Sequence, residues 1–200
     1  VYPLDKAEIV RLHEETRLLS RLVDDLRELA LADAGRLHLN LQSVDAAAVV
    51  RATADSLALV AAAQEVTLSA RSPDDLPPVR ADPDRLGQVL RNLLVNALHY
   101  TPPGGSVVVT AAPTAKAVEI AVVDTGEGIA PEDLAHIFER FWRVDPSRVR
   151  DKEWAGGSGL GLSVAQSLVE AQGGRIWAES VLGQGSTFRF TLPLASGQDG

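Results

Sequence analysis

The sequence predicts a mixed α/β domain that follows one long helix of a helical bundle. Over residues 5–34, apolar side chains recur at steps of three and four, which is typical of a helix with an apolar seam. From residue 45 onward, helical segments alternate with short strand-like segments. The 200 residues allow one full domain and an appendage, so two large domains are not expected.

Composition narrows the classes of function. The 19 Lys and Arg residues against 27 Asp and Glu residues give a net charge of −8, which argues against a nucleic-acid partner. The lack of cysteine excludes disulfides, thiolate metal sites and cysteine nucleophiles. No apolar run approaches the roughly 18 residues that cross a bilayer. Because the chain starts at Val1 and contains no Met, we expect a piece of a longer protein, with any membrane anchor upstream.

The first predicted helix covers residues 5–34 and ends at Gly35. Leu18, Leu22 and Leu29 widen its apolar stripe beyond that of a two-stranded coil, so a helical bundle is favoured. A lone helix cannot bury this stripe, and we therefore expect partner helices. Packing of the helix on its own domain is the alternative. The seam consists of Ile9, Leu12, Thr16, Leu19, Val23, Leu26 and Ala30.

The remaining elements follow in order along the chain. Asp82 and Pro83 supply a cap and a first helical residue. Residues 37–44 and 129–158 are expected to be irregular, and residues 195–200 to form a disordered tail. Helices are predicted over residues 45–63, 82–100 and 160–172, and strands over residues 65–70, 79–81, 106–111, 117–124, 175–180 and 187–192.

The helix predicted over residues 82–100 carries a polar stripe that a core does not require. Gln88, Asn92, Asn96 and His99 lie together, away from the apolar face. Asn is a poor interior helix former, so two Asn residues one turn apart cost stability. Their amides can donate to phosphate or offer an oxygen to Mg²⁺ without adding negative charge. A purely structural role is an equal alternative.

Two glycine segments suit a nucleotide. Asp124 ends a strand before Gly126 and Gly128, where a flat ligand can approach the backbone and the carboxylate can accept the amine of adenine. Residues 156–162 lead straight into a helix, whose free N–H groups bind phosphate. Aromatic and basic residues over 138–152 match a nucleotide lid. An ordinary Asp-Gly turn and a solvated charged loop are the alternatives.

The order of these segments is more specific than any one of them. Residues 183–188 are similar to the last glycine turn of sensor histidine kinases of two-component systems. The resemblance covers residues 5–194 and implies a two-layer α/β sandwich of Bergerat type, with a mixed sheet and helices on one face. The segments that resemble that family's N, G1, F and G2 boxes are Asn92-x-x-x-Asn96, Asp124-x-Gly126-x-Gly128, Phe138-x-x-Phe141 and Gly157-x-Gly159-x-Gly161.

The resemblance also implies a role for each site residue. Asn96 would bind Mg²⁺, Asn92 the phosphates and Arg143 the terminal phosphate, and these three form the predicted catalytic set. Asp124 would hold the adenine amine, with support from Thr187. The whole predicted ATP site is Asn92, Asn96, His99, Tyr100, Asp124, Gly126, Gly128, Arg140, Arg143, Lys152, Gly157, Ser158, Gly159, Leu160, Gly161, Leu162 and Thr187.

The activity that the resemblance implies is transfer of the terminal phosphate of ATP to a histidine nitrogen, with ATP and Mg²⁺ as cofactors. Residues 1–36 would be the second helix of a dimerisation hairpin with its hinge, and residues 37–194 the catalytic ATP-binding domain. The implied partners are a response regulator and a second copy of the chain. The implied location is cytoplasmic, with a membrane anchor upstream.

Two departures from the family pattern matter. His99 stands where the family has a basic residue, so one phosphate contact is expected to be weaker or pH-dependent. The first hairpin helix with its phosphoacceptor is missing, and His13 lacks the basic residue and proline of an acceptor motif, so we expect no acceptor here. The alternatives are a non-catalytic nucleotide-sensing module and an ATP hydrolase, although the hydrolases need a Glu in place of Asn92.

Overall fold

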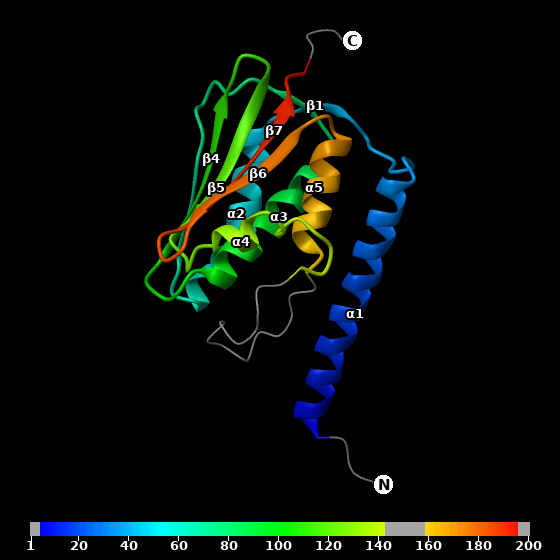
Figure 1. The fold of residues 1–200 in the computed structure, drawn as a ribbon, viewed down its shortest axis with the longest axis vertical. Helices are drawn as coiled ribbons and strands as arrows, with labels where there is room; N and C mark the ends of the chain where they lie inside the picture. Colours follow the sequence, from blue (N-terminus) through cyan, green and yellow to red (C-terminus); the bar gives the residue numbers. More distant parts are fainter. Residues whose placement is uncertain (1–4, 143–158, 196–200) are drawn as a thin grey trace.

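A five-stranded sheet with helices on one face forms the body of the molecule, and a long helix runs along the outside of the helical layer (Figure 1). The computed structural model describes residues 5–142 and 159–195. The strand order is β2-β4-β5-β7-β6, in which β2 and β4 are parallel and the other neighbours antiparallel. The mixed sheet predicted from the sequence is therefore confirmed. The strands are β2 (Thr67–Arg71), β4 (Ser106–Pro113), β5 (Ala117–Asp124), β6 (Arg175–Val181) and β7 (Gly185–Pro193).

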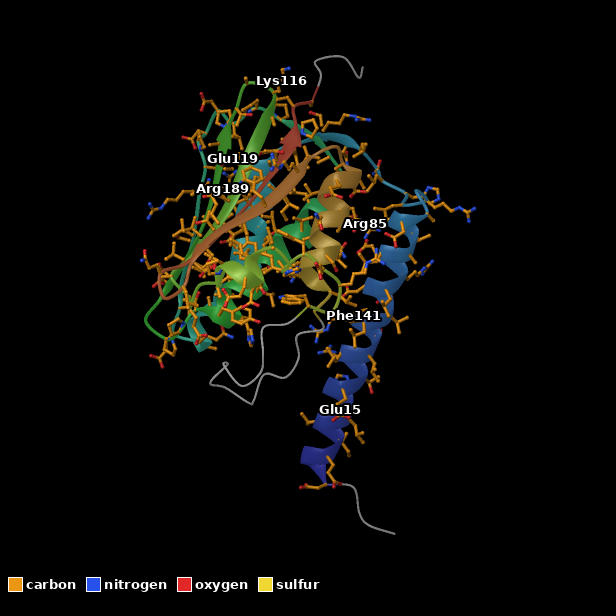
Figure 2. All side chains as sticks on the ribbon, viewed as in Figure 1. Glu15, Arg85, Lys116, Glu119, Phe141 and Arg189 are labelled. Atoms are coloured by element: carbon orange, nitrogen blue, oxygen red, sulfur yellow. The ribbon has the colours of Figure 1, made fainter. Side chains whose placement is uncertain are left out.

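Three helices, α2 (Ala46–Ala63), α3 (Pro83–Tyr100) and α5 (Gly161–Ala171), cover one face of this sheet. Their apolar sides meet alternate residues of the strands in one core. The outer face of the sheet carries charged side chains, and the guanidinium of Arg189 donates to Glu119 there at 2.8 Å (Figure 2). The buried core of α3 and β7 consists of Leu86, Val89, Leu90, Leu93, Leu94, Ala97, Leu98, Phe188, Phe190 and Leu192.

Helix α2 is long and apolar enough, with a mean hydropathy of 1.5, to cross a membrane, which was not expected from the sequence. Of its 18 residues, 39% are buried inside the domain. Val50 and Leu57 are among the residues that it places in the core. It is therefore a core helix of this domain.

Local signals account for where the helices begin. The Oδ1 of Asp82 accepts hydrogen bonds from the backbone N–H groups of Asp84 (3.0 Å) and Arg85 (3.2 Å), and Pro83 occupies the first helical position of α3. Asp45 caps α2 in the same way. These caps satisfy N–H groups that have no partner within the helix. The predicted starts of both helices are confirmed.

Two short elements were not predicted. Strand β1 (Gln42–Val44) pairs antiparallel with β3 (Val79–Ala81) in a separate two-stranded sheet, and α4 (Pro131–Leu134) forms a single turn. The expectation of irregular structure is therefore wrong at both places. A strand of three residues depends on its distant partner rather than on its own pattern, so sequence periodicity does not reveal it.

Helix α1 (Lys6–Asp33) ends as predicted, at a glycine in the left-handed conformation. Gly35 has φ +63°, and its N–H donates to the carbonyl oxygen of Ala32 at 3.0 Å. The N–H of Arg36 donates to the carbonyl oxygen of Leu31 at 2.8 Å. This pair of bonds satisfies carbonyl groups that the helix leaves open and turns the chain sharply back toward the domain.

Helix α1 has two different apolar faces. Leu29 is 1% exposed and belongs to the core of the domain, and Leu22 packs against that core. The predicted seam faces away, and the part of α1 that contains Glu15 extends past the domain (Figures 1 and 2). Helix α1 therefore packs on its own domain and still presents an uncovered seam. The exposed seam residues include Ile9, Leu12, Leu19, Val23 and Leu26.

Candidate functional site

Asp124, the last residue of β5, is buried and held by backbone N–H groups. The residue is only 5% exposed. Its Oδ1 accepts hydrogen bonds from the backbone N–H groups of Gly126 (2.8 Å) and Ser186 (3.1 Å). Burial raises the pKa of the Asp124 carboxyl, and the two N–H groups oppose this rise because they stabilise the charged form. Among the described residues no donor bonds Oδ2, which leaves this oxygen for a ligand.

The glycines that follow Asp124 make room for neighbouring backbone. A Cβ on Gly126 would lie 2.5 Å from the carbonyl oxygen of Tyr100, at the end of α3. A Cβ on Gly128, which has φ +70°, would lie 2.1 Å from the carbonyl oxygen of Val181. The loop is thus wedged between α3 and the β6–β7 hairpin. This packing explains why both positions require glycine.

Ser186, the neighbour of the predicted site residue Thr187, is the β7 residue that contacts Asp124. Thr187 pairs with Val123, and the burial alternation along β7 puts its side chain on the outer face of the sheet, with Arg189. Ser186 is 8% exposed and contacts Asp124 through its N–H. Because a shift of one residue along a strand reverses the face, the Thr187 side chain points away from Asp124, and Ser186 is the β7 residue that contacts it.

The polar stripe of α3 faces the start of α5. The Nδ2 of Asn92 donates to the carbonyl oxygen of Gly161 at 3.0 Å, which joins two predicted site residues. Asn96 follows one turn later and is half-buried. At the end of the helix, the ring of His99 lies edge-on to the ring of Tyr100, with 4.6 Å between centroids. The stripe therefore runs from the start of α5 to the loop after Asp124.

Backbone contacts join the chain on the two sides of residues 143–158. The N–H of Phe141 donates to the carbonyl oxygen of Gly159 at 2.9 Å, and a Cβ on Gly159 would lie 2.9 Å from the Cα of Phe141. Leu160 is buried just before α5, and Leu162 is half-buried in its first turn. These backbone contacts hold Gly159 and Phe141 together just before α5. The predicted site residues Arg143, Lys152, Gly157 and Ser158 lie outside the described residues.

The two phenylalanines of the F box have different environments. The ring of Phe138 is half-buried and lies edge-on to Phe188 in the core, with 6.5 Å between centroids. Phe141 is 59% exposed and has φ +62°, a conformation that is strained for a residue other than glycine. Phe138 therefore anchors the segment before residue 143, whereas Phe141 is presented to solvent.

Arg140, which was predicted to bind ATP, is held by α1. Its Nη2 donates to both carboxylate oxygens of Asp33, at 2.6 and 2.7 Å. Both side chains are about half exposed, at 44% and 56%. The structure therefore places the Arg140 guanidinium against the last turn of α1 and not in the nucleotide site.

A second polar contact joins α1 to the stripe of α3. Glu28 is buried, and its two carboxylate oxygens accept hydrogen bonds from Arg85 and Gln88. Figure 2 shows Arg85 between α1 and the rest of the domain. Gln88 lies one turn before Asn92, so α1 contacts the same stripe. Glu28 was not singled out from the sequence, because an acidic residue on an amphipathic helix is ordinarily a solvated one.

These contacts define two ends of one candidate site along α3. The end at Tyr100 offers the carboxylate acceptor of Asp124, and the end at Asn92 offers amides and the N-terminus of α5, which suit phosphate. Eight helical steps separate Asn92 from Tyr100, which is about 12 Å along the helix axis. Among the described residues no three His, Asp or Glu side chains form a group that could hold a metal ion.

A hollow of about 550 Å³ lies at the other end of α3 and does not belong to this site. His38, Asn40 and Asp84 are among the residues that line it. The 18 residues of α3 separate it from the loop after Asp124 by about 27 Å.

Comparison with known protein families gives a match over residues 81–196 to the family described as histidine kinase-, DNA gyrase B-, and HSP90-like ATPase. This range contains both ends of the candidate site. Helix α1, with Glu28 and Asp33, lies before it.

Related chains are sensory kinases. The adaptive-response sensory kinase SasA from Synechococcus elongatus is 40% identical over 181 residues, which is 90% of this chain and 46% of the relative. The sensor histidine kinase WalK from Bacillus subtilis is 36% identical, over 92% of this chain and 30% of the relative. Full-length ShkA, solved in complex with AMPPNP, has a TM-score of 0.83 and 32% identity, over 98% of this chain and 41% of that one. The chain thus spans less than half the length of each.

Proposed function

Because the chain belongs to the family of histidine kinase-, DNA gyrase B- and HSP90-like ATPases, we propose that it is the ATP-binding kinase module of a two-component sensor histidine kinase. The module binds ATP with Mg²⁺ and transfers the terminal phosphate to a histidine on a helix outside these 200 residues. The observation that carries the proposal is Asp124, buried and held through one carboxylate oxygen with the other left for a ligand.

Asp124 recognises the adenine base. Its Oδ2 accepts an N–H of the exocyclic amine of adenine, whereas the carbonyl of guanine at the same place would set two acceptors against each other. The backbone N–H groups on Oδ1 hold the carboxylate in one orientation, so little conformational entropy is lost when the base binds. Tyr100, at the end of α3, lines the same end of the site.

Asn92, Asn96 and the α5 N-terminus hold the phosphates. The bond from Asn92 to Gly161 ties the helix that carries the amides to the helix whose N–H groups face the anion. Asn96 is the proposed Mg²⁺ ligand, because its amide oxygen is neutral and leaves the other coordination positions to phosphate and water. When bound, Mg²⁺ neutralises charge on the phosphates during transfer.

The site favours transfer over hydrolysis. Hydrolysis needs a general base that takes a proton from water, and the amide of Asn92 at this position cannot act as one. Its Nδ2 is already committed to the carbonyl oxygen of Gly161. The nucleophile must therefore come from elsewhere, as a histidine on another helix would.

The organisation that goes with this function has residues 1–36 as half of a dimerisation hairpin with its hinge and residues 37–194 as the catalytic domain. The uncovered seam of α1 supports a helical partner. The proposed partners are a second copy of the chain and a response regulator. The proposed location of the module is the cytoplasm, in a full-length protein anchored to the membrane by another segment.

Binding of ATP tests the site. Asp124→Asn retains an acceptor for the two N–H groups but loses the charge that attracts the amine, so we expect the Kd for Mg-ATP in calorimetry to rise by about tenfold or more with the fold intact. The exposed Asp84→Asn is the matched control and should bind as the parent does. An unchanged Kd in Asp124→Asn would refute the site.

Phosphate transfer tests the reaction. The chain is incubated with ATP that carries a radioactive terminal phosphate, and with a fragment of the parent protein that contains the complete helical hairpin. We expect an acid-labile label on the fragment and none on the chain. Asn96→Ala should lose the label together with the Mg²⁺ dependence of ATP binding. Release of inorganic phosphate without any labelled protein would identify a hydrolase instead.

A further inference from the structure

A row of three polar side chains crosses the end of the sheet on its helix-covered face. Asp124, Ser186 and Ser180 stand side by side on β5, β7 and β6, since Ser186 pairs with Ser180 and its N–H reaches Asp124. The next row inward is apolar and contains Val122 and Phe188. Ser180 has no counterpart among the residues predicted from the sequence to form the site.

The three contacts of Ser180 determine the direction of every hydrogen bond in the row. Its Oγ lies 2.8 Å from the backbone N of Ile129, 2.8 Å from the carbonyl oxygen of Gly185 and 3.0 Å from the Oγ of Ser186. The N–H of Ile129 can only donate, and the carbonyl of Gly185 can only accept. A hydroxyl has one proton, so Ser180 gives it to Gly185. The proton between the two serines must therefore come from Ser186.

This direction makes the Ser186 oxygen an acceptor toward the rest of the site. Its proton points toward β6, whereas Asp124 lies on the opposite side, on β5. Among the described residues no donor bonds the Ser186 Oγ, and none bonds the Oδ2 of Asp124. This end of the site therefore presents two acceptor oxygens and no side-chain donor from the row.

We propose that Ser180 is a positioning residue that sets the nucleotide preference of the site without touching the nucleotide. By accepting the Ser186 proton, Ser180 prevents the Ser186 hydroxyl from donating to a base carbonyl. The two acceptors then match the two N–H groups of an exocyclic amine and repel a carbonyl at the same position. This inference rests on the proposed function, in which the Asp124 end of the site binds the base.

Removal of the Ser180 hydroxyl tests this role. In Ser180→Ala the Ser186 hydroxyl can rotate and donate, so we expect the ratio of the GTP Kd to the ATP Kd to fall by about tenfold. Ser180→Thr retains the hydroxyl and should keep the ratio of the parent. A merely structural role would weaken both nucleotides together and leave the ratio unchanged in Ser180→Ala, which would overturn the inference.

Two further variants keep the test decisive. Ser180→Cys has a side chain of similar size that hydrogen-bonds poorly, so it should lower the same ratio even if Ser180→Ala folds badly. A ratio in Ser180→Cys equal to that of the parent would also overturn the inference. Asp124→Asn distinguishes failure of the Ser180 role from failure of the proposed base site. If it loses ATP while the Ser180 variants keep the parent ratio, only the role of Ser180 fails; if it binds ATP normally, the proposed base site fails.

Discussion

Arg140 and Asp33, 107 residues apart in the sequence, form an ion pair that ties the segment before residue 143 to the last turn of α1. Both partners are about half exposed, so water and salt screen their attraction. A pair of this kind contributes up to about 1 kcal/mol to folding. Its main consequence is positional, because it keeps the Arg140 guanidinium on α1.

Arg140→Gln should therefore leave ATP binding nearly intact. We expect the Kd for Mg-ATP to stay within about twofold of the parent value, and the free energy of unfolding to fall by no more than about 1 kcal/mol. Calorimetry and urea unfolding measure the two quantities, and Asp33→Asn should give the same small loss of stability. A tenfold loss of ATP affinity in Arg140→Gln alone would return this residue to the nucleotide site.

Glu28→Ala should loosen α1 from the domain. The variant leaves the hydrogen-bond donors of Arg85 and Gln88 without their buried acceptor, and we expect a loss of about 1–3 kcal/mol in the free energy of unfolding. Glu15→Ala removes a carboxylate from the exposed part of the same helix and should change stability by less than about 0.5 kcal/mol. Equal effects of the two variants in urea unfolding would show that the Glu28 contact contributes nothing.

The pH dependence of stability should reveal Asp25, which lies on the partly buried side of α1. Burial, followed by the charge of Glu28, raises the pKa of the Asp25 carboxyl above its usual value of 3.8. Ionisation therefore costs more in the folded than in the unfolded chain, and stability falls as the pH rises from 3.8 through the folded pKa.

Asp25→Asn removes this cost, so the variant should be more stable than the parent at pH 7 and should lose its advantage as the pH falls toward 3.8. Urea unfolding at a series of pH values measures the difference. Asp24→Asn, on the exposed neighbour, removes only the smallest of the causes that act on Asp25 and should give a smaller gain. A variant that is less stable than the parent at pH 7 would contradict the sign of this shift.

Gly128→Ala should break the packing of the loop after Asp124. The added Cβ would lie 2.1 Å from the carbonyl oxygen of Val181 at a residue with φ +70°, so we expect a loss of roughly 3 kcal/mol or more in stability, together with weaker ATP binding. Gly183 also has a positive φ, +80°, but an added Cβ meets nothing within 4 Å. Gly183→Ala should therefore cost only about 1 kcal/mol, the strain of the left-handed conformation. Similar costs in thermal unfolding would remove the steric explanation.

Elements with strong local signals were predictable from the sequence. The start of α3 follows from a capping Asp and a proline at the first helical position, and the end of α1 follows from Gly35, because each depends on bonds to residues a few positions away. Strand β1 was missed because its pairing with β3 forms only in the folded domain. Element boundaries thus depend on neighbours in sequence, and short strands on neighbours in space.

The candidate site was predictable in its glycines and amides but not in its neighbours. Asp124 was expected from its place at a strand end. On β7 the sequence pointed to Thr187, which lies on the other face of the sheet, and not to its neighbour Ser186. Arg140 was expected at the phosphates because a cation beside a glycine loop suits an anion, but its partner Asp33 lies on a helix whose docking no motif encodes. Contacts between distant elements decided both cases.

Because only its C-terminal part is packed on the domain, the two ends of α1 should open at different rates. The C-terminal turns, where Leu29 is inserted in the core, open only when the domain itself unfolds, so their amide protons should exchange as slowly as those of the sheet. The turns around Leu12 have no such anchor, and a helix end without tertiary contacts frays within microseconds. Amide exchange should therefore be slow after Leu22 and fast before it. Binding of a partner to the seam should slow exchange only in the N-terminal part.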